Sequence, residues 1–228
     1  MKIIQKLNEN FKNGAVTIAF LGDSVTHGFF ESGGVMHSSC DFQAVYHNRF
    51  KQMLNLLFPT MPINIINAGI GGDSANVGAE RLERDVISKS PDLAVVCFGL
   101  NDINGTLESY IYSLNKIFNR LKENKIETIF MTPNMLNTYV SPDCVSDLRE
   151  YAQKTAEIQT GGKMDSFMDA AVRCAKTHNI PVADCYSKWK ELYNCGIDTT
   201  QLLANRINHP KRDMHELFAY ELLQTILK

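Results

Sequence analysis

A serine near the start of the chain stands where an apolar run stops. Residues 18–21 are apolar, and Gly22, Asp23 and Ser24 follow them directly. A serine delivered in this way to the rim of a sheet can act as a nucleophile, provided that a base takes its proton and donors stabilise the oxyanion. Taken alone, the tripeptide favours another role, because a serine after Asp is usually a helix N-cap or a turn residue.

Two later segments hold groups that can bind an oxyanion. Gly71 and Gly72 can expose backbone N–H groups at the start of a helix, where the macrodipole favours negative charge. Asn101 follows another apolar run, and its amide can either donate to an oxyanion or cap a turn. A dinucleotide loop is disfavoured, because a third glycine is missing and Lys89 stands about twenty residues on, where an acid is expected.

A general base is still needed, and histidine is the usual one at neutral pH. Of the six histidines, His209 stands out because it lies in a polar C-terminal loop, beside Pro210 and before the last predicted helix. His27 is the main rival, although it lies in the helix that carries Ser24 away. The spacing of six between His209 and His215 matches no helical metal pair, so the sequence predicts no metal site and no cofactor.

The apolar runs and helical stripes predict how these groups meet. Strands are expected over residues 16–21, 63–67, 93–98, 128–131 and 181–185, alternating with helices over residues 41–58, 74–87, 107–124, 164–178 and 214–227. This alternation predicts one α/β domain over residues 1–228, with a five-stranded parallel sheet covered on both faces. In such sheets ligands bind outside the carboxyl ends of the strands, where Ser24, Gly72 and Asn101 would all lie.

Three further segments complete the predicted organisation. Residues 1–14 are expected to form an amphipathic lead-in helix that ends near Asn13 and Gly14. Residues 29–39 are rich in Gly, Ser and His and are expected to form a loop. Residues 137–162 are less regular, and we expect a lid-like excursion there.

Composition and charge exclude several functional classes. The chain has 228 residues, 44% of them hydrophobic, and a net charge of −2 without any Lys/Arg-rich run, so no nucleic-acid surface is expected. The N-terminus lacks the pattern of a signal peptide, and no window approaches the roughly 18 apolar residues of a membrane span. The six cysteines form no close pair, which indicates reduced thiols and a cytoplasmic protein.

Four blocks occur in order at the expected strand exits and in the C-terminal loop. They are Gly-Asp-Ser-Val-Thr at 22–26, Asn-Ala-Gly-Ile-Gly-Gly-Asp at 67–73, Gly-Leu-Asn-Asp at 99–102 and His-Pro at 209–210. Together, over about residues 16–218, they resemble the SGNH hydrolase superfamily, often called GDSL esterases or lipases. The resemblance implies a flavodoxin-like, three-layer α/β/α fold. It also implies that Ser24 is the nucleophile and His209 the general base, with the Ser24 N–H, the Gly72 N–H and the Asn101 side chain as the oxyanion hole.

The chain departs from that family at one position. The family usually has Asp three residues before the histidine, and here Arg206 stands there. An arginine cannot accept the imidazole N–H, and its charge disfavours the imidazolium that forms during catalysis. We favour a dyad oriented by a carbonyl, and loss of activity is the alternative. The candidate orienting groups are the side chains of Asn205, Asp184, Asp198 and Asp213 and the main-chain carbonyl near Ile207.

The sequence therefore predicts a serine esterase that forms an acyl-enzyme. A small acyl group, acetyl above all, on a sugar or xylo-oligosaccharide is favoured, because the chain resembles bacterial carbohydrate-acetylesterase-like members of the family. A lysophospholipase or thioesterase with the same residues is the nearest rival, and a non-catalytic binding protein of flavodoxin-like fold is the rival from another class. Phe29, Phe30, His37 and Tyr139 could line the substrate pocket, or could simply pack in loops and core. The sequence does not specify the oligomeric state.

Overall fold

The computed structural model of the chain describes every residue except 10, 12–13 and 35–36. In the described residues, the main sheet has five parallel strands in the order β4-β1-β5-β6-β7. This order places β1 in the interior of the sheet, with later strands added on both sides of it, as in flavodoxin-like folds. The predicted fold class is confirmed. The strands are β1 (Val16–Gly22), β4 (Ile63–Gly69), β5 (Leu93–Cys97), β6 (Glu127–Met131) and β7 (Val182–Ala183).

The register of the central strands puts three strand exits at the same level. Gly22, the last residue of β1, pairs with Gly69 of β4 on one side and with Cys97 of β5 on the other. The residues that follow these three positions therefore leave the sheet together at its carboxyl edge. Every residue of β5 is buried, as expected for a strand with helices on both faces.

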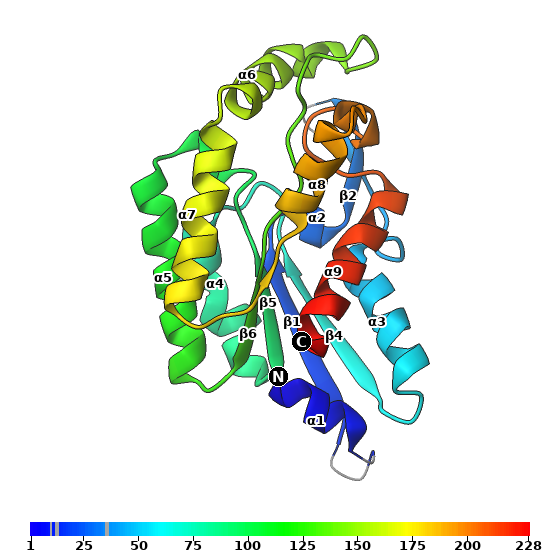
Figure 1. The fold of residues 1–228 in the computed structure, drawn as a ribbon, viewed down its shortest axis with the longest axis vertical. Helices are drawn as coiled ribbons and strands as arrows, with labels where there is room; N and C mark the ends of the chain where they lie inside the picture. Colours follow the sequence, from blue (N-terminus) through cyan, green and yellow to red (C-terminus); the bar gives the residue numbers. More distant parts are fainter. Residues whose placement is uncertain (10, 12–13, 35–36) are drawn as a thin grey trace.

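Helices cover both faces of the sheet, and two groups of them are visible on either side in Figure 1. Contacts join α4 to α5 and α5 to α7 in one group, and α3, α1 and α8 to α9 in the other. The first group is α4 (Ala75–Asp85), α5 (Leu107–Glu123) and α7 (Lys163–Thr177). The second group is α1 (Lys2–Asn8), α3 (Tyr46–Leu57), α8 (Cys185–Asn194) and α9 (His215–Leu227). Among the described residues, no helix is both long and apolar enough to cross a membrane.

Short helical turns occupy several connections. The four-residue helix α2 (Ser24–His27) follows β1 directly. Five 3₁₀ turns lie elsewhere in the described chain: η2 (Ile87–Lys89), η3 (Asp102–Asn104), η4 (Ser146–Leu148), η5 (Thr199–Leu202) and η6 (Arg212–Met214).

The segment predicted as a loop over residues 29–39 is instead an antiparallel pair of strands, β2 (Phe29–Gly34) and β3 (His37–Cys40). Val35 is its single β-branched residue, and its glycines disfavour a strand. Tertiary contacts stabilise it instead, since the side chain of Phe30 is fully buried.

The lead-in helix is shorter than predicted. Helix α1 ends at Asn8, where Glu9 adopts an extended backbone, whereas the sequence favoured an end near residue 14. Residues 10, 12 and 13, and with them the predicted stop at Asn13, lie outside the described residues.

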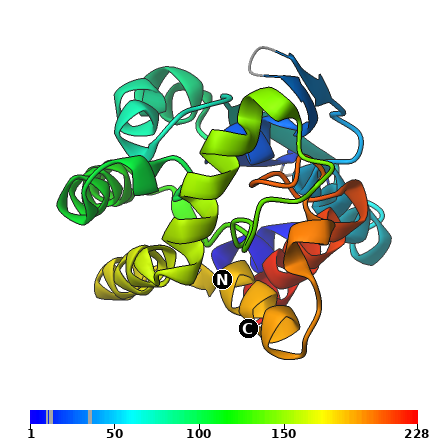
Figure 2. The same ribbon diagram turned by 90° about the horizontal axis from the view of Figure 1, so that it is seen from above.

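The irregular segment over residues 137–162 contains η4 and helix α6 (Arg149–Thr160). Figure 1 shows α6 above the carboxyl edge of the sheet, and Figure 2 shows that it crosses over the sheet from one side to the other. A small apolar cluster of Cys144, Ala152 and Ile207 joins this segment to the C-terminal loop.

Candidate active site

Ser24 is held at the carboxyl edge by the turn from β1 into α2. Asp23 is the N-cap of α2, and its Oδ1 accepts from the Val25 N–H at 3.0 Å. A side chain at Gly22 would place Cβ 2.1 Å from Thr26 Oγ1, so the turn needs a glycine there. The cap predicted from the tripeptide thus exists, but Asp23 supplies it. Ser24 itself is the first helical residue, whose N–H has no partner within the helix.

The side chains of Ser24 and His209 are in hydrogen-bond contact. His209 Nε2 lies 3.0 Å from Ser24 Oγ, and His209 Nδ1 lies 3.0 Å from the carbonyl oxygen of Phe30. A carbonyl oxygen can only accept, so Nδ1 carries the proton and Nε2 is free to accept from the serine hydroxyl. Burial lowers the pKa of His209 from 6.5 to about 4, and the imidazole is therefore neutral at pH 7.

Asn205 shapes the loop that carries His209. Its Oδ1 accepts from the backbone N–H groups of Ile207, Asn208 and His209 at 3.0, 2.9 and 2.9 Å. Its Nδ2 donates to Asn208 Oδ1 at 2.8 Å. Asn205 therefore fixes the backbone of the loop and does not bind the imidazole.

The five groups suggested by the sequence do not orient His209. Ile207 O accepts from the Asn137 N–H at 2.8 Å, and Asp198 accepts from the Tyr139 hydroxyl at 2.7 Å. Asp184 caps α8 and accepts from Thr132 Oγ1 at 3.0 Å, and Asp213 is exposed in η6. The expected kind of orienting group, a main-chain carbonyl, is present, but it belongs to Phe30 and not to the neighbourhood of Ile207.

Arg206 pairs with a carboxylate, whereas the aspartate that usually stands at its position in the family accepts from the imidazole. It adopts a left-handed backbone with φ of 62°, and its Nη2 lies 2.9 Å from Asp143 Oδ2. It also donates to the carbonyl of Leu203. The side chain therefore ties the His209 loop to the segment before α6.

The candidate oxyanion donors line the same cavity as the serine. Asn101 Nδ2 donates one N–H to the carbonyl of Asp73 at 2.8 Å, which fixes the side-chain amide. Gly72 has a left-handed backbone with φ of 82°. A Cβ at the neighbouring Gly71 would lie 2.3 Å from Phe29 Cε2, so the aromatic ring packs directly on this turn.

These groups share one cavity of about 380 Å³. The sequence identified part of its lining, and Tyr139 is not among the residues that line it. His37 begins β3, but its side chain is not described. Phe29 on β2 lines the cavity as predicted. Ser32 on β2, Ser38 on β3, Leu148 in η4 and Tyr151 in α6 were missed, because nothing in their sequence marks them as neighbours of Ser24. The lining residues are Ser24, Phe29, Ser32, Ser38, Gly71, Gly72, Asn101, Leu148, Tyr151, Asn205, Ile207, Asn208 and His209.

The other histidines whose side chains the structure describes have other partners. His27 stacks on Phe29, with ring centroids 4.5 Å apart. His47 Nε2 lies 3.2 Å from the Thr26 carbonyl, His178 Nε2 lies 2.7 Å from Asn115 Oδ1, and His215 Nδ1 accepts from the Tyr46 N–H at 3.1 Å. Among the described side chains, His209 is thus the histidine that hydrogen-bonds to Ser24, and His27 is not.

Buried acids lie beneath the site. Asp102 Oδ1 accepts from the Ala75 N–H at 2.9 Å and so holds the start of α4. Burial raises the pKa of Asp102 to about 6 and that of Asp23 to about 7. Arg81 joins the ends of β1 and β4, because it donates to the carbonyls of Gly22 and Ala68 at 2.9 and 2.7 Å. Among the described residues, no cluster of His, Cys, Asp or Glu could hold a metal ion.

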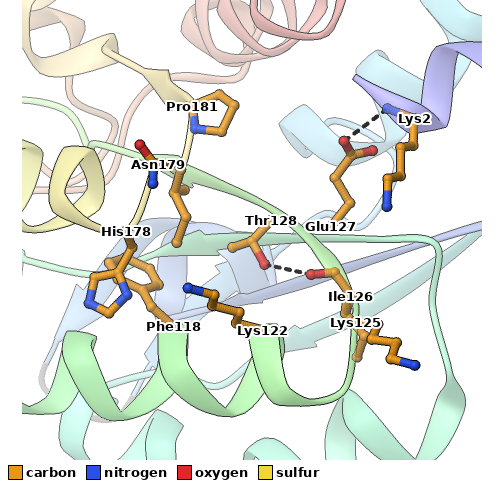
Figure 3. Close-up of a pocket in the computed structure, with 11 residues that line it drawn as sticks. Lys2, Phe118, Lys122, Lys125, Ile126, Glu127, Thr128, His178, Asn179 and Pro181 are labelled. Atoms are coloured by element: carbon orange, nitrogen blue, oxygen red, sulfur yellow. Dashed lines mark hydrogen bonds between the residues drawn. The ribbon is translucent and has the colours of Figure 1, made fainter.

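A second cavity, of about 420 Å³, lies at the amino ends of β6 and β7, away from Ser24 (Figure 3). Lys122 and His178 line it, and Glu127 there accepts from the backbone N–H of Lys2 at 2.9 Å. It offers no serine–histidine contact, so the chemistry is expected at the smaller cavity.

Comparison with models of protein families identifies one match. The chain matches the model of the GDSL-like lipase/acylhydrolase family over residues 20–217. No curated protein matches the chain.

Solved structures share the fold. An acetylxylan esterase from Geobacillus stearothermophilus is 22% identical, with a TM-score of 0.68 over 92% of this chain and 94% of that one. A two-domain esterase active on acetylated mannans has the same identity and TM-score, over 99% of this chain and 51% of its own. An α/β hydrolase from the metagenome of Lake Arreo, Spain, is also 22% identical, with a TM-score of 0.68 over 92% of this chain and 95% of that one.

Proposed function

The chain belongs to the GDSL-like lipase/acylhydrolase family, a family of carboxylic ester hydrolases, and we propose that it is a serine esterase that removes a small acyl group, acetyl above all, from a sugar or other small alcohol. The observation that carries this proposal is the placement of His209. Its Nε2 lies 3.0 Å from Ser24 Oγ, while its Nδ1 is held by a carbonyl oxygen. This arrangement presents a neutral base to the serine hydroxyl.

In the first half-reaction, Ser24 Oγ attacks the ester carbonyl carbon and His209 Nε2 takes the hydroxyl proton. The carbonyl oxygen becomes an oxyanion, which accepts from the Ser24 N–H, the Gly72 N–H and the second N–H of the Asn101 amide. The bond between the carbonyl carbon and the alcohol oxygen then breaks. His209 returns its proton to the departing alcohol, and the acyl group stays on Ser24.

In the second half-reaction, water takes the place of the alcohol. His209 Nε2 accepts a proton from water as the water oxygen attacks the acyl carbon, and the same three donors hold the oxyanion. The bond to Ser24 Oγ breaks, Oγ recovers its proton from His209, and the carboxylic acid leaves. No group besides this chain and water is needed for the atoms to balance.

The lining of the cavity supports a polar alcohol. Ser32 and Ser38 from the hairpin, Tyr151 from α6 and Asn208 from the His209 loop all line it. Such hydroxyl and amide groups suit the hydroxyls of a sugar better than an alkyl chain. The acetylxylan esterase and the esterase active on acetylated mannans share the fold, and they support the same substrate class.

Hydrolysis of p-nitrophenyl acetate by the wild-type protein and by Ser24→Ala tests the proposal. We expect the variant to lose nearly all of the wild-type rate. Wild-type activity no greater than that of Ser24→Ala would leave the non-catalytic binding protein as the better explanation. An acyl-length series of nitrophenyl esters and a panel of acetylated sugars then separate an acetylesterase from a lysophospholipase or thioesterase, for which longer acyl chains would be the better substrates.

A further inference from the structure

The carbonyl that holds His209 belongs to a part of the fold with little support of its own. Phe30 lies on β2, and among the described residues no strand pairing joins β2 and β3 to the main sheet. An isolated two-stranded ribbon is at best marginally stable in water. The position of the Phe30 carbonyl relative to His209 Nδ1 therefore depends on the side-chain contacts that hold this ribbon against the rest of the fold.

Arg212 contacts both chain segments of the ribbon near its open end, where Phe29 pairs with Cys40. Its Nε lies 2.9 Å from Asp41 Oδ2, directly after β3, and its Nη2 lies 3.2 Å from Glu31 Oε2, next to Phe30 on β2. Its Nη1 donates to the other carboxylate oxygen of Glu31. The planar guanidinium thus uses three nitrogens on two carboxylates, a geometry that lysine cannot reproduce.

The same guanidinium also covers the Phe30 ring. The Arg212 Cζ lies 4.4 Å from the ring centroid, within the range of a cation–π contact. The Phe30 ring is fully buried and lies 4.9 Å from the ring of His215 in α9. Phe30 is thus fixed by its side chain, while its carbonyl oxygen accepts from His209.

Arg212 is also close to His209 along the chain, because it follows three residues later. A single side chain therefore connects the loop that carries the base to the strand that carries its acceptor. In the family an acid three residues before the histidine usually accepts from the imidazole itself, and Arg206 occupies that position here.

We propose that Arg212 is a positioning residue, which holds the Phe30 carbonyl against His209 Nδ1 and so keeps Nε2 unprotonated toward Ser24. This inference rests on the proposed function for its catalytic consequence, but the tautomer of His209 can be observed without any activity. Loss of the clamp lets the carbonyl move, and the imidazole then populates the wrong tautomer and orientation. A displacement of about 1 Å in such a site can cost about 10²-fold in rate.

Nitrogen NMR of ¹⁵N-histidine-labelled protein tests the inference directly. The signals of His209 are identified by their absence from the spectrum of His209→Gln. We expect wild-type His209 to be a single tautomer with the proton on Nδ1 near neutral pH. We expect Arg212→Ala to show a mixture of tautomers, and Arg212→Lys to lie between the two because it keeps the charge but not the fork.

Arg120→Ala is the matched control. Arg120 Nη2 pairs with Glu83 Oε2 at 2.6 Å, and the exposure of these side chains, 42% and 59%, is close to the 38% and 51% of Arg212 and Glu31. This pair joins α5 to α4, away from His209. We expect Arg120→Ala to keep the wild-type tautomer and rate.

Kinetics with p-nitrophenyl acetate give the second measurement. Arg212→Ala is expected to lose about 10²-fold in kcat with little change in KM, since p-nitrophenyl acetate has no sugar hydroxyls for Ser32 and Ser38 of the ribbon to bind. A folded Arg212→Ala with the wild-type tautomer and kcat overturns the inference. Should that variant fail to fold, Glu31→Ala removes one arm of the clamp, and a wild-type tautomer there overturns the inference equally. If the wild-type protein proves inactive, the proposed function fails while the tautomer comparison still decides the role of Arg212.

Discussion

The guanidinium of Arg206 is paired with the carboxylate of Asp143, with Nη2 and Nε at 2.9 and 3.0 Å from Oδ2. This pair joins the loop of His209 to the segment that precedes α6. The imidazole Nδ1 is already satisfied by the Phe30 carbonyl. Position 206 is therefore not required to supply an acceptor, and its arginine has a separate structural partner 63 residues away in the sequence.

Restoring the usual acid at position 206 is therefore expected not to raise activity. Arg206→Asp would place a carboxylate close to Asp143, and the repulsion would loosen the loop. We expect a lower melting temperature and a kcat equal to or below that of the wild type. Arg206→Ala, which removes the pair without adding a charge, should fall between the two proteins in stability. A clear gain in kcat for Arg206→Asp would contradict the proposed orientation by Phe30.

Removal of the Asn101 amide tests the oxyanion hole. We expect Asn101→Ala to lower kcat by about 10²–10³-fold, because the amide donates to the oxyanion and not to the ground-state ester. KM for p-nitrophenyl acetate should change little. Asn124→Ala, at the C-terminal end of α5, is the matched control and should leave both constants unchanged. A rise in KM with an unchanged kcat would instead assign Asn101 to ground-state binding.

The sheet and its exits could be predicted from the sequence because their physical signals are local. Residues 93–97 form an uninterrupted apolar run, and every one of them is buried in the sheet. Ser24 and Asn101 each follow such a run, whereas Gly72 follows β4, which contains Asn64 and Asn67. Parallel pairing brings the exits of these strands together, and the C-terminal loop adds His209 to the same cavity. The catalytic roles of these residues remain predictions that the experiments above address.

The group that orients His209 could not be predicted, because every residue has a carbonyl and nothing in the sequence marks the one that is used. Phe30 lies 179 residues before His209 and on a ribbon whose Gly- and Ser-rich sequence favours a loop. Asn205 was suggested as an orienting group because its carbonyl could reach the ring, but that oxygen is occupied by three backbone N–H groups. Which carbonyl accepts from His209 is decided by a contact between segments far apart in the sequence, and the local pattern does not reveal such a contact.

The pH dependence of kcat/KM is expected to reflect a buried histidine. Burial lowers the pKa of His209 from 6.5 to about 4, because the imidazolium loses its hydration. The base acts when neutral, so activity should be present above this pKa and fall as the pH drops through about 4. Measuring kcat/KM again after the protein is returned to pH 7 distinguishes titration of His209 from acid unfolding. Titration is reversed at once, so full activity should return immediately, whereas unfolded protein would regain activity slowly or not at all. An acidic limb near 6.5 would indicate that His209 is solvated in the free enzyme.

Asp23 should make the stability of the protein depend on pH in a way that is unusual for a carboxyl group. It is 1% exposed, and its Oδ2 has no hydrogen-bond partner among the described residues. Burial, with Asp102 and Asp73 nearby, raises its pKa from 3.8 to about 7. Between these values the folded protein holds a proton that the unfolded chain has released. The free energy of unfolding therefore falls as the pH rises from about 4 to 7.

As the pH rises from 5 to 8, the free energy of unfolding is expected to fall less for Asp23→Asn than for the wild type. The amide oxygen can still accept from the Val25 N–H, but no buried charge forms at high pH. The free energy of unfolding of the variant minus that of the wild type should rise by on the order of 2–4 kcal/mol from pH 5 to pH 8. Urea unfolding at both pH values measures it, and comparing the two proteins cancels the contribution of the buried histidines. Asp169→Asn, on the exposed side of α7, should follow the wild type at both pH values. A pH-independent difference for Asp23→Asn would mean that Asp23 is ionised in the folded protein throughout.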